Sequence, residues 1–139
     1  MKDALKTLER VKKFEIDEQR RVLMQKLQKE ENLQLTLKKL IEDYENEKEF
    51  MMQNPTLCDF GVYTEQYLKK KRAIEKDIAE VQAEIDKIRD VMADMFKEQK
   101  TFEIVTKNRH KRKMKELAEQ EQKLLDEVGT NTYIKKHQQ

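Results

Sequence analysis

The feature that most constrains this chain is a heptad repeat over residues 74–95. Its apolar residues recur at alternating spacings of four and three, at Ile74, Ile78, Val81, Ile85, Ile88, Met92 and Met95. An α-helix turns once in about 3.6 residues, so a repeat averaging about 3.5 residues keeps one narrow apolar stripe on one side of the helix. The residues between these positions are mostly charged. The pattern therefore predicts a long helix that packs against one partner helix.

An earlier stretch of the chain offers that partner. Its apolar positions are Ala4, Leu8, Val11, Leu23, Leu27, Leu33, Leu37, Leu40, Ile41, Tyr44 and Met51, and Leu35 widens the stripe. Between the two halves of this stripe, Phe14 and Ile16 stand off the register while Glu15 and Glu18 take its positions. We expect this blurred part to be the weakest segment of the helix–helix interface.

A turn separates the two stripes. Pro55 is the only proline, lacks a backbone donor and disfavours a helical residue before it. We therefore expect a first helix over residues 3–53, with Asp3 as its N-cap, and a turn over residues 54–61. In that turn, Asp59 is the candidate cap and Gly61 a flexible joint for the next helix.

The second helix is expected over residues 62–128. Gly129 is its predicted stop, because glycine adopts the left-handed conformation that often ends helices. Residues 129–139 then form a flexible tail. A turn of about eight residues returns the chain in the opposite direction. The sequence thus predicts an all-α protein, with two long helices forming an antiparallel coiled-coil hairpin as a single domain over residues 1–139.

The expected hairpin has a register and an overhang. Pairing about the turn places residues whose numbers add up to about 115 side by side, so Leu37 faces Ile78 and Leu33 lies near Val81. The second helix outruns the first from near Arg112 and has no partner within the chain beyond that point.

Composition narrows the class of protein. Charged residues make up 42% of the 139 residues, against about 25% in ordinary domains, so a thick globular core is not expected. The net charge of +2 is too small to indicate nucleic-acid binding by itself. Cys58 is alone, which excludes an internal disulfide and favours a cytosolic compartment. No apolar run approaches the roughly 20 residues of a membrane span, and the charged start lacks a secretory signal.

Catalytic and metal-binding patterns are not found. His110 and His137 are the only histidines, and neither stands at helical spacing from Cys58. Two glycines cannot build a phosphate-binding loop. We expect a protein that is not an enzyme and that needs no cofactor or metal.

The sharpest charge feature is a basic run followed by an acidic stretch. The basic residues are Lys107, Arg109, His110, Lys111, Arg112, Lys113 and Lys115, and the acidic ones are Glu116, Glu119, Glu121, Asp126 and Glu127. Three interpretations remain open for the basic run: a solvated helix face, a site for an acidic protein partner, or a nucleic-acid site.

Two apolar groups lie outside the central stripe. Tyr63 and Tyr67, with Phe60, form an aromatic group at the expected hairpin tip, which either caps the helix interface or docks a partner. On the overhang, Leu117, Leu124, Leu125 and Val128 form a second apolar stripe. A lone helix cannot bury it, so a partner or a second copy of the chain is implied.

These residues together resemble a known family. The segment KFEIDEQRR at residues 13–21, within residues 8–23, resembles the opening of FliJ, the coiled-coil protein of the bacterial flagellar type III export apparatus, in its alphaproteobacterial form. The turn with Asn54 and Pro55, the tyrosines before a charged second helix, and the basic then acidic carboxyl-terminal part are similar too. The resemblance covers nearly the whole chain.

The resemblance implies a function in flagellum biogenesis and protein transport. Such a hairpin is similar to the stalk of a rotary ATPase, and it inserts its open end into the hexameric flagellar export ATPase. Its other end contacts the cytoplasmic part of the export gate, a membrane protein. Family members also act as escorts for export chaperones. A cytoplasmic protein is implied, peripherally associated with the inner-membrane apparatus and without direct membrane insertion.

The resemblance names the partner at each end, and the aromatic, apolar and basic groups described above supply the expected binding residues. At the ATPase end these are Lys111, Arg112, Lys113, Lys115, Leu117, Leu124 and Val128, together with residues 1–11 of the first helix. At the gate end they are Tyr44, Tyr63 and Tyr67. Nucleic acid is not an expected partner, although a basic-helix nucleic-acid-binding coiled coil is the first alternative function. A homodimeric structural rod is the second.

Overall fold

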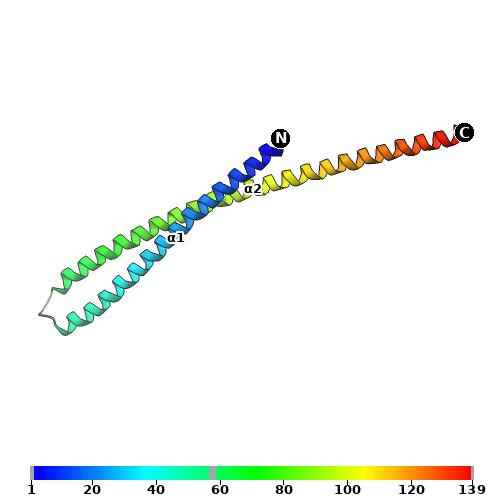
Figure 1. Cartoon of the computed structure of the whole chain (residues 1–139). Coiled ribbons are helices and arrows are strands. Elements are labelled where there is room, and N and C mark those ends of the chain that lie inside the picture. The colour runs from blue at the N-terminus through cyan, green and yellow to red at the C-terminus, as the bar shows by residue number, and fades with distance from the viewer. Residues whose placement is uncertain (1, 57–58, 139) are drawn as a thin grey trace. The chain divides into compact units, whose positions relative to one another are not determined.

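The computed structural model describes residues 2–56 and 59–138, and within them the chain is all-helical. Helix α1 covers Lys2–Gln53, which is 52 residues, and helix α2 covers Phe60–Gln138, which is 79 residues (Figure 1). No strand occurs among the described residues. Cys58 and the side chain of Asp3, the expected N-cap, lie outside the described part of the chain. The predicted all-α class is confirmed.

Helix α1 ends where the proline predicts. Its last residue is Gln53, and the next backbone amide, of Asn54, donates to the carbonyl oxygens of Phe50 at 3.1 Å and Met51 at 3.2 Å. The Asn54 side-chain amide also donates to the Phe50 carbonyl, at 3.1 Å. These bonds satisfy carbonyl groups that a helix end leaves without partners. Pro55 follows directly and cannot continue the helix.

Helix α2 begins with a side-chain cap. The Asp59 carboxylate oxygen Oδ1 accepts from the backbone amides of Gly61 at 3.0 Å and Val62 at 3.3 Å. These are the second and third residues of the helix, so Asp59 is its N-cap, as predicted. The expected joint at Gly61 is wrong, because this glycine lies inside the first helical turn and has no positive φ.

The predicted stop at Gly129 is also wrong. Helix α2 continues through it to Gln138, and Gly129 has no positive φ. Residues 129–138 are therefore helical, not a flexible tail. The Thr132 hydroxyl donates to the Val128 carbonyl at 2.8 Å across this glycine. A glycine within a helix costs only about 1 kcal/mol relative to alanine, which does not suffice to end it.

The chain divides into two compact units, Met1–Phe96 and Lys97–Gln139. In the first unit, α1 contacts the first part of α2. The Tyr44 and Tyr67 rings stack at 3.8 Å, the Gln82 amide donates to Glu30 at 3.2 Å, and Lys26 pairs with Glu84 at 2.7 Å. The partner's number rises along α2 as the number along α1 falls. These contacts are compatible with a helical hairpin.

The same contacts correct the predicted register. The two residue numbers add up to about 111 at each of these three pairs, not to about 115. The difference is about four residues, or one helical turn. On this register Leu37 is level with Ile74, and the expected pair of Leu37 with Ile78 is wrong. The interlocking side chains set the register, whereas the prediction took it from the midpoint of the turn.

The central stripe of α2 faces α1, as predicted. Ile78, Val81, Ile85 and Met92 are buried, and Ile74, Ile88 and Met95 are half-buried. On α1, however, the most buried side chain is Ile16, which is 2% exposed. Leu8, Val11 and Leu35, which the sequence pattern placed on the stripe, are exposed.

The inward positions of α1 explain this correction. Buried or half-buried residues recur at spacings of three and four, at Ile16, Gln19, Leu23, Lys26, Glu30, Leu33, Leu37, Leu40 and Tyr44. Ile16 is therefore on the register and not off it. Gln19, Lys26 and Glu30 occupy inward positions because long polar side chains cover apolar surface with their stems while their ends reach water.

Candidate interaction surfaces

The aromatic group at the turn end of the first unit is centred on Tyr44. Its ring centroid lies 3.8 Å from that of Tyr67, 5.9 Å from that of Tyr63 and 6.1 Å from that of Phe60. Its hydroxyl is 3.1 Å from the Thr64 hydroxyl oxygen. Three rings of α2 thus gather around one ring of α1, and they join the two helices close to the turn.

This arrangement bears on the expected docking tyrosines. Tyr67 is buried, and Tyr44 and Tyr63 are half-buried. Of the two interpretations of the tip, these contacts favour capping of the helix–helix interface. Partial burial raises the pKa of the Tyr63 phenol, and the carboxylates of Glu47 and Asp43 raise it further. The group therefore carries acidic neighbours on its α1 side.

Exposed apolar residues at the same end were missed by the sequence prediction. Phe50 and Met52 at the end of α1, and Val62 at the start of α2, are all exposed. All three are large apolar residues outside the heptad stripe, and that pattern could have identified them as exposed. We call these three residues the tip patch.

Polar contacts join the helices where α1 has polar inward positions. The Lys26 ammonium lies 2.7 Å from the Glu84 carboxylate, and this hydrogen bond, together with the charge of Lys26, lowers the pKa of Glu84. The Gln82 amide donates to Glu30. The Arg20 guanidinium lies 5.6 Å from the centre of the Phe96 ring. The two contacts of Lys26 with Glu84 and of Gln82 with Glu30 favour one register over its neighbours.

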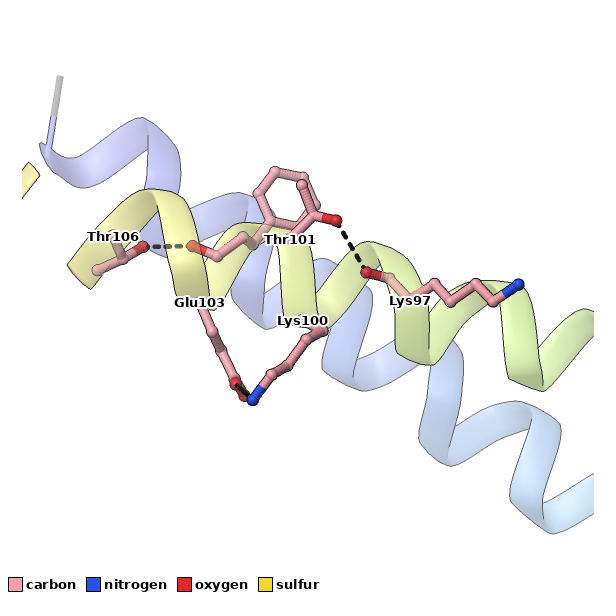
Figure 2. Close-up of polar contacts among 6 residues, drawn as sticks. Lys97, Lys100, Thr101, Glu103 and Thr106 are labelled. Carbon is pink, nitrogen blue, oxygen red and sulfur yellow. Dashed lines mark hydrogen bonds and ion pairs between the residues drawn. The ribbon is translucent and has the colours of Figure 1, made fainter. Parts of the chain in front are cut away.

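The second unit begins with a stretch of contacts within one helix (Figure 2). The Thr101 hydroxyl donates to the Lys97 carbonyl at 3.0 Å, and the Thr106 hydroxyl donates to the Phe102 carbonyl at 2.8 Å. Lys100 and Glu103 form an ion pair at 3.8 Å. Threonine hydroxyls that bond four residues back stay within their own helix.

Every described side chain from Thr106 to His137 is exposed. This segment contains all the residues predicted for the ATPase end on the second helix: Lys111, Arg112, Lys113, Lys115, Leu117, Leu124 and Val128. The three apolar members are 45%, 63% and 56% exposed, respectively. Met114 and Leu125 are exposed as well. Sequence analysis missed Met114 because it lies inside the basic run.

The apolar residues of this segment do not continue the register of the first unit. Steps of three and four from Met95 and Phe102 lead to polar residues, at Thr106, Arg109, Lys113, Glu116, Gln120 and Lys123. The apolar stripe of the second unit is displaced by one residue, to Met114, Leu117, Leu124 and Val128, with Glu121 between them. We call it the overhang stripe. It is a separate surface from the one that contacts α1.

Among the described residues, no group of three or more histidine, cysteine or acidic side chains is placed to hold a metal ion. Neither described helix has a segment long and apolar enough to cross a membrane.

Comparison with protein families, with curated proteins and with solved structures finds no match to this chain.

Proposed function

We propose that the chain is a non-enzymatic stalk of the FliJ type, which couples the hexameric flagellar export ATPase to the export gate. The proposal rests on the sequence resemblance. The structural observation that supports it most is the exposed segment of α2 over residues 106–137, which we call the overhang and which carries an apolar stripe and a basic run on one helix. Such a helix suits insertion into a larger partner.

The stalk is an antiparallel coiled-coil hairpin. Its support is the set of contacts between α1 and α2, in which rising numbers on one helix meet falling numbers on the other. Cysteine pairs test it in a Cys58→Ser background. Leu37→Cys with Ile74→Cys should form an intramolecular disulfide on oxidation at low concentration, while Leu37→Cys with Ile78→Cys should form less. Only intermolecular products would contradict the hairpin.

At the ATPase end, charge and apolar surface have different tasks. Lys111, Arg112, Lys113 and Lys115 steer the overhang towards acidic groups of the ring, and the overhang stripe contacts its inner wall. Charges at the rim of an interface act mainly on the association rate, whereas buried apolar groups act on dissociation.

This division defines the main experiment. Replacing the four basic residues by glutamate should slow association with the purified export ATPase in a salt-dependent way. Leu117→Ala with Leu124→Ala should instead speed dissociation. Both changes should reduce any stimulation of ATP hydrolysis. A control that replaces Lys69, Lys70 and Arg72 by glutamate also alters exposed basic residues of α2, and it should leave association unchanged. If a chain truncated after Lys115 binds and stimulates as well as the full chain, the overhang is not the insertion element.

At the gate end, the proposed surface combines the predicted tyrosines with the tip patch. Tyr44 and Tyr67 hold the helices together, so direct contact with the gate falls mainly to Tyr63, Phe50 and Met52. Phe50→Ser with Met52→Ser should weaken binding to the cytoplasmic part of the gate while leaving helicity unchanged by circular dichroism. Unchanged binding would remove these two residues from the surface. Export chaperones are proposed as further partners, with the protein located in the cytoplasm beside the inner-membrane apparatus.

One observation favours an alternative function. The basic residues at 107–115 are all exposed on a single helix, as in helices that bind the phosphate backbone of nucleic acid. Binding to unrelated DNA that weakens steeply as salt rises would favour this alternative. The adjoining acidic residues argue against it, because they repel phosphate.

A further inference from the structure

We propose that the overhang pairs with the overhang of a second copy of this chain, antiparallel, with Met114 opposite Leu124 and Lys113 beside Glu127 of the second copy. This inference does not rest on the proposed function. It starts from three observations. The overhang stripe is exposed, it has its own register, and the segment that carries it is basic in its first half and acidic in its second.

The spacing of the overhang stripe selects the kind of partner. Met114, Leu117, Glu121, Leu124 and Val128 follow one another at steps of three and four, which is the pattern that fits a single facing helix. The heptad positions that face α1 in the first unit carry polar residues in this segment, so the overhang stripe lies on a different face of α2. A helix with the same heptad spacing is required, and the overhang itself has it.

Charge selects the direction of pairing. The basic residues lie at 107–115 and the acidic ones at 116–127. Two parallel copies in register would set the basic halves side by side, where like charges repel. Two antiparallel copies can instead bring Lys111, Arg112 and Lys113 of one copy level with Asp126 and Glu127 of the other. The sequence is thus self-complementary in one direction only.

The heptad positions then select the register. In the first unit, Tyr44 and Tyr67 stack across the interface, and they occupy heptad positions a and d of their respective helices. The same rule places Met114 opposite Leu124 and Leu117 opposite Glu121 of the second copy. Lys113 and Glu127 flank the stripe and meet across the interface, and twofold symmetry repeats every contact. Each copy's Lys111 is then level with the other's Glu127.

Pairing covers the overhang stripe, so it competes with any other occupant of that surface. If the overhang also enters a ring-shaped ATPase, the paired form is a state in which that end is blocked. Self-association and ATPase binding would then be mutually exclusive. The two are separable by experiment, because self-association is measured on the purified chain alone.

Sedimentation equilibrium of the full chain tests the pairing. A concentration-dependent dimer with a dissociation constant of about 100 µM or below is expected, since only about three heptads contribute. Leu117→Glu with Leu124→Glu should abolish it. Circular dichroism of this variant should show retained helicity, because both side chains are exposed. A chain that stays monomeric up to several times that concentration would overturn the proposal.

Cysteine exchange tests direction and register. In a Cys58→Ser background, mixing the Met114→Cys and Leu124→Cys variants should give a disulfide-linked heterodimer, while each variant alone should give little product. Self-linkage of Met114→Cys alone would indicate parallel pairing and overturn the proposal. A better yield from mixing Leu117→Cys with Val128→Cys would overturn this register.

A charge exchange isolates the proposed ion pair. Lys113→Glu or Glu127→Lys alone should raise the dimer dissociation constant about tenfold at low salt, since each puts like charges together at two symmetric places. The double variant should return to within about threefold of the unchanged chain. Lys123→Glu makes the same charge change on the outward face and is the matched control. No recovery in the double variant would overturn the pairing of Lys113 with Glu127.

Discussion

Two stretches of helix α2 carry heptad stripes of similar apolar residues, yet one is buried and the other is not. Ile78, Val81 and Ile85 are 7%, 2% and 3% exposed, whereas Leu117, Leu124 and Val128 are 45%, 63% and 56% exposed. The first stripe contacts α1 within its own unit, and the second has no partner within its unit. The comparison teaches that a heptad stripe specifies which face of a helix is apolar and able to pack. Whether that face contributes to folding depends on a second helix that packs against it.

The largest expected effect tests this difference with matched isoleucines. Ile85→Ala should lower the free energy of unfolding by about 2–4 kcal/mol, because it removes buried methyl groups and leaves a cavity between α1 and α2. Ile134→Ala, on an exposed isoleucine of the second unit, should change it by about 0.5 kcal/mol or less. Urea denaturation followed by circular dichroism measures both. Equal effects would mean that burial between α1 and α2 is not what makes Ile85 stabilising.

The aromatic group gives the next largest effect. Tyr44→Ala should cost about 2–4 kcal/mol of unfolding free energy, because it removes the ring around which Phe60, Tyr63 and Tyr67 gather. Tyr133→Ala removes an exposed ring of the second unit and is the control. Thermal unfolding distinguishes them. If Tyr44→Ala is as mild as the control, the rings do not hold α1 to α2.

A smaller effect is expected at the cap of α2. Asp59→Ala should destabilise the first unit by about 1 kcal/mol, since the amides of Gly61 and Val62 lose their acceptor. Asp59→Asn keeps a side-chain oxygen at the cap and should recover most of the loss. Denaturant unfolding of the two variants makes the comparison. An asparagine variant as destabilised as the alanine variant would argue against capping.

The smallest effect concerns the pair of Lys26 and Glu84. Its hydrogen bond lowers the pKa of Glu84 in the folded chain, so the folded state binds a proton there less readily than the unfolded state. The contribution is present above the unfolded pKa of about 4.3 and is lost as pH falls through the folded pKa. Glu84→Gln should therefore lower the Tm slightly at pH 7 and not at pH 2. An equal shift at both pH values would show that the pair's charge is not involved.

Local rules predicted the ends of the helices near the turn and the inward face of α2. Pro55 and Asp59 act within a few residues of themselves, so their effects can be read from the sequence alone. The stripe of α2 was visible because it is almost wholly aliphatic. The exposure of the residues predicted for the ATPase end could also be expected from the sequence, because a helix with no partner in its own unit exposes every face. Gly129 was misjudged because a weak local preference was treated as decisive.

The sequence by itself thus determined the two helices, the turn between them and the apolar face of α2. Only the tertiary structure decided which face of α1 turns inward and at what register. The hydropathy pattern of that face is interrupted by polar residues at Gln19, Lys26 and Glu30. The prediction therefore placed Leu8 and Val11 at the interface and left Ile16 out of it. The reason is physical: a polar side chain is compatible with an inward position only if the opposite helix accepts its stem and leaves its end in water. That condition depends on the facing residues, such as Glu84 for Lys26, which lie far away along the chain.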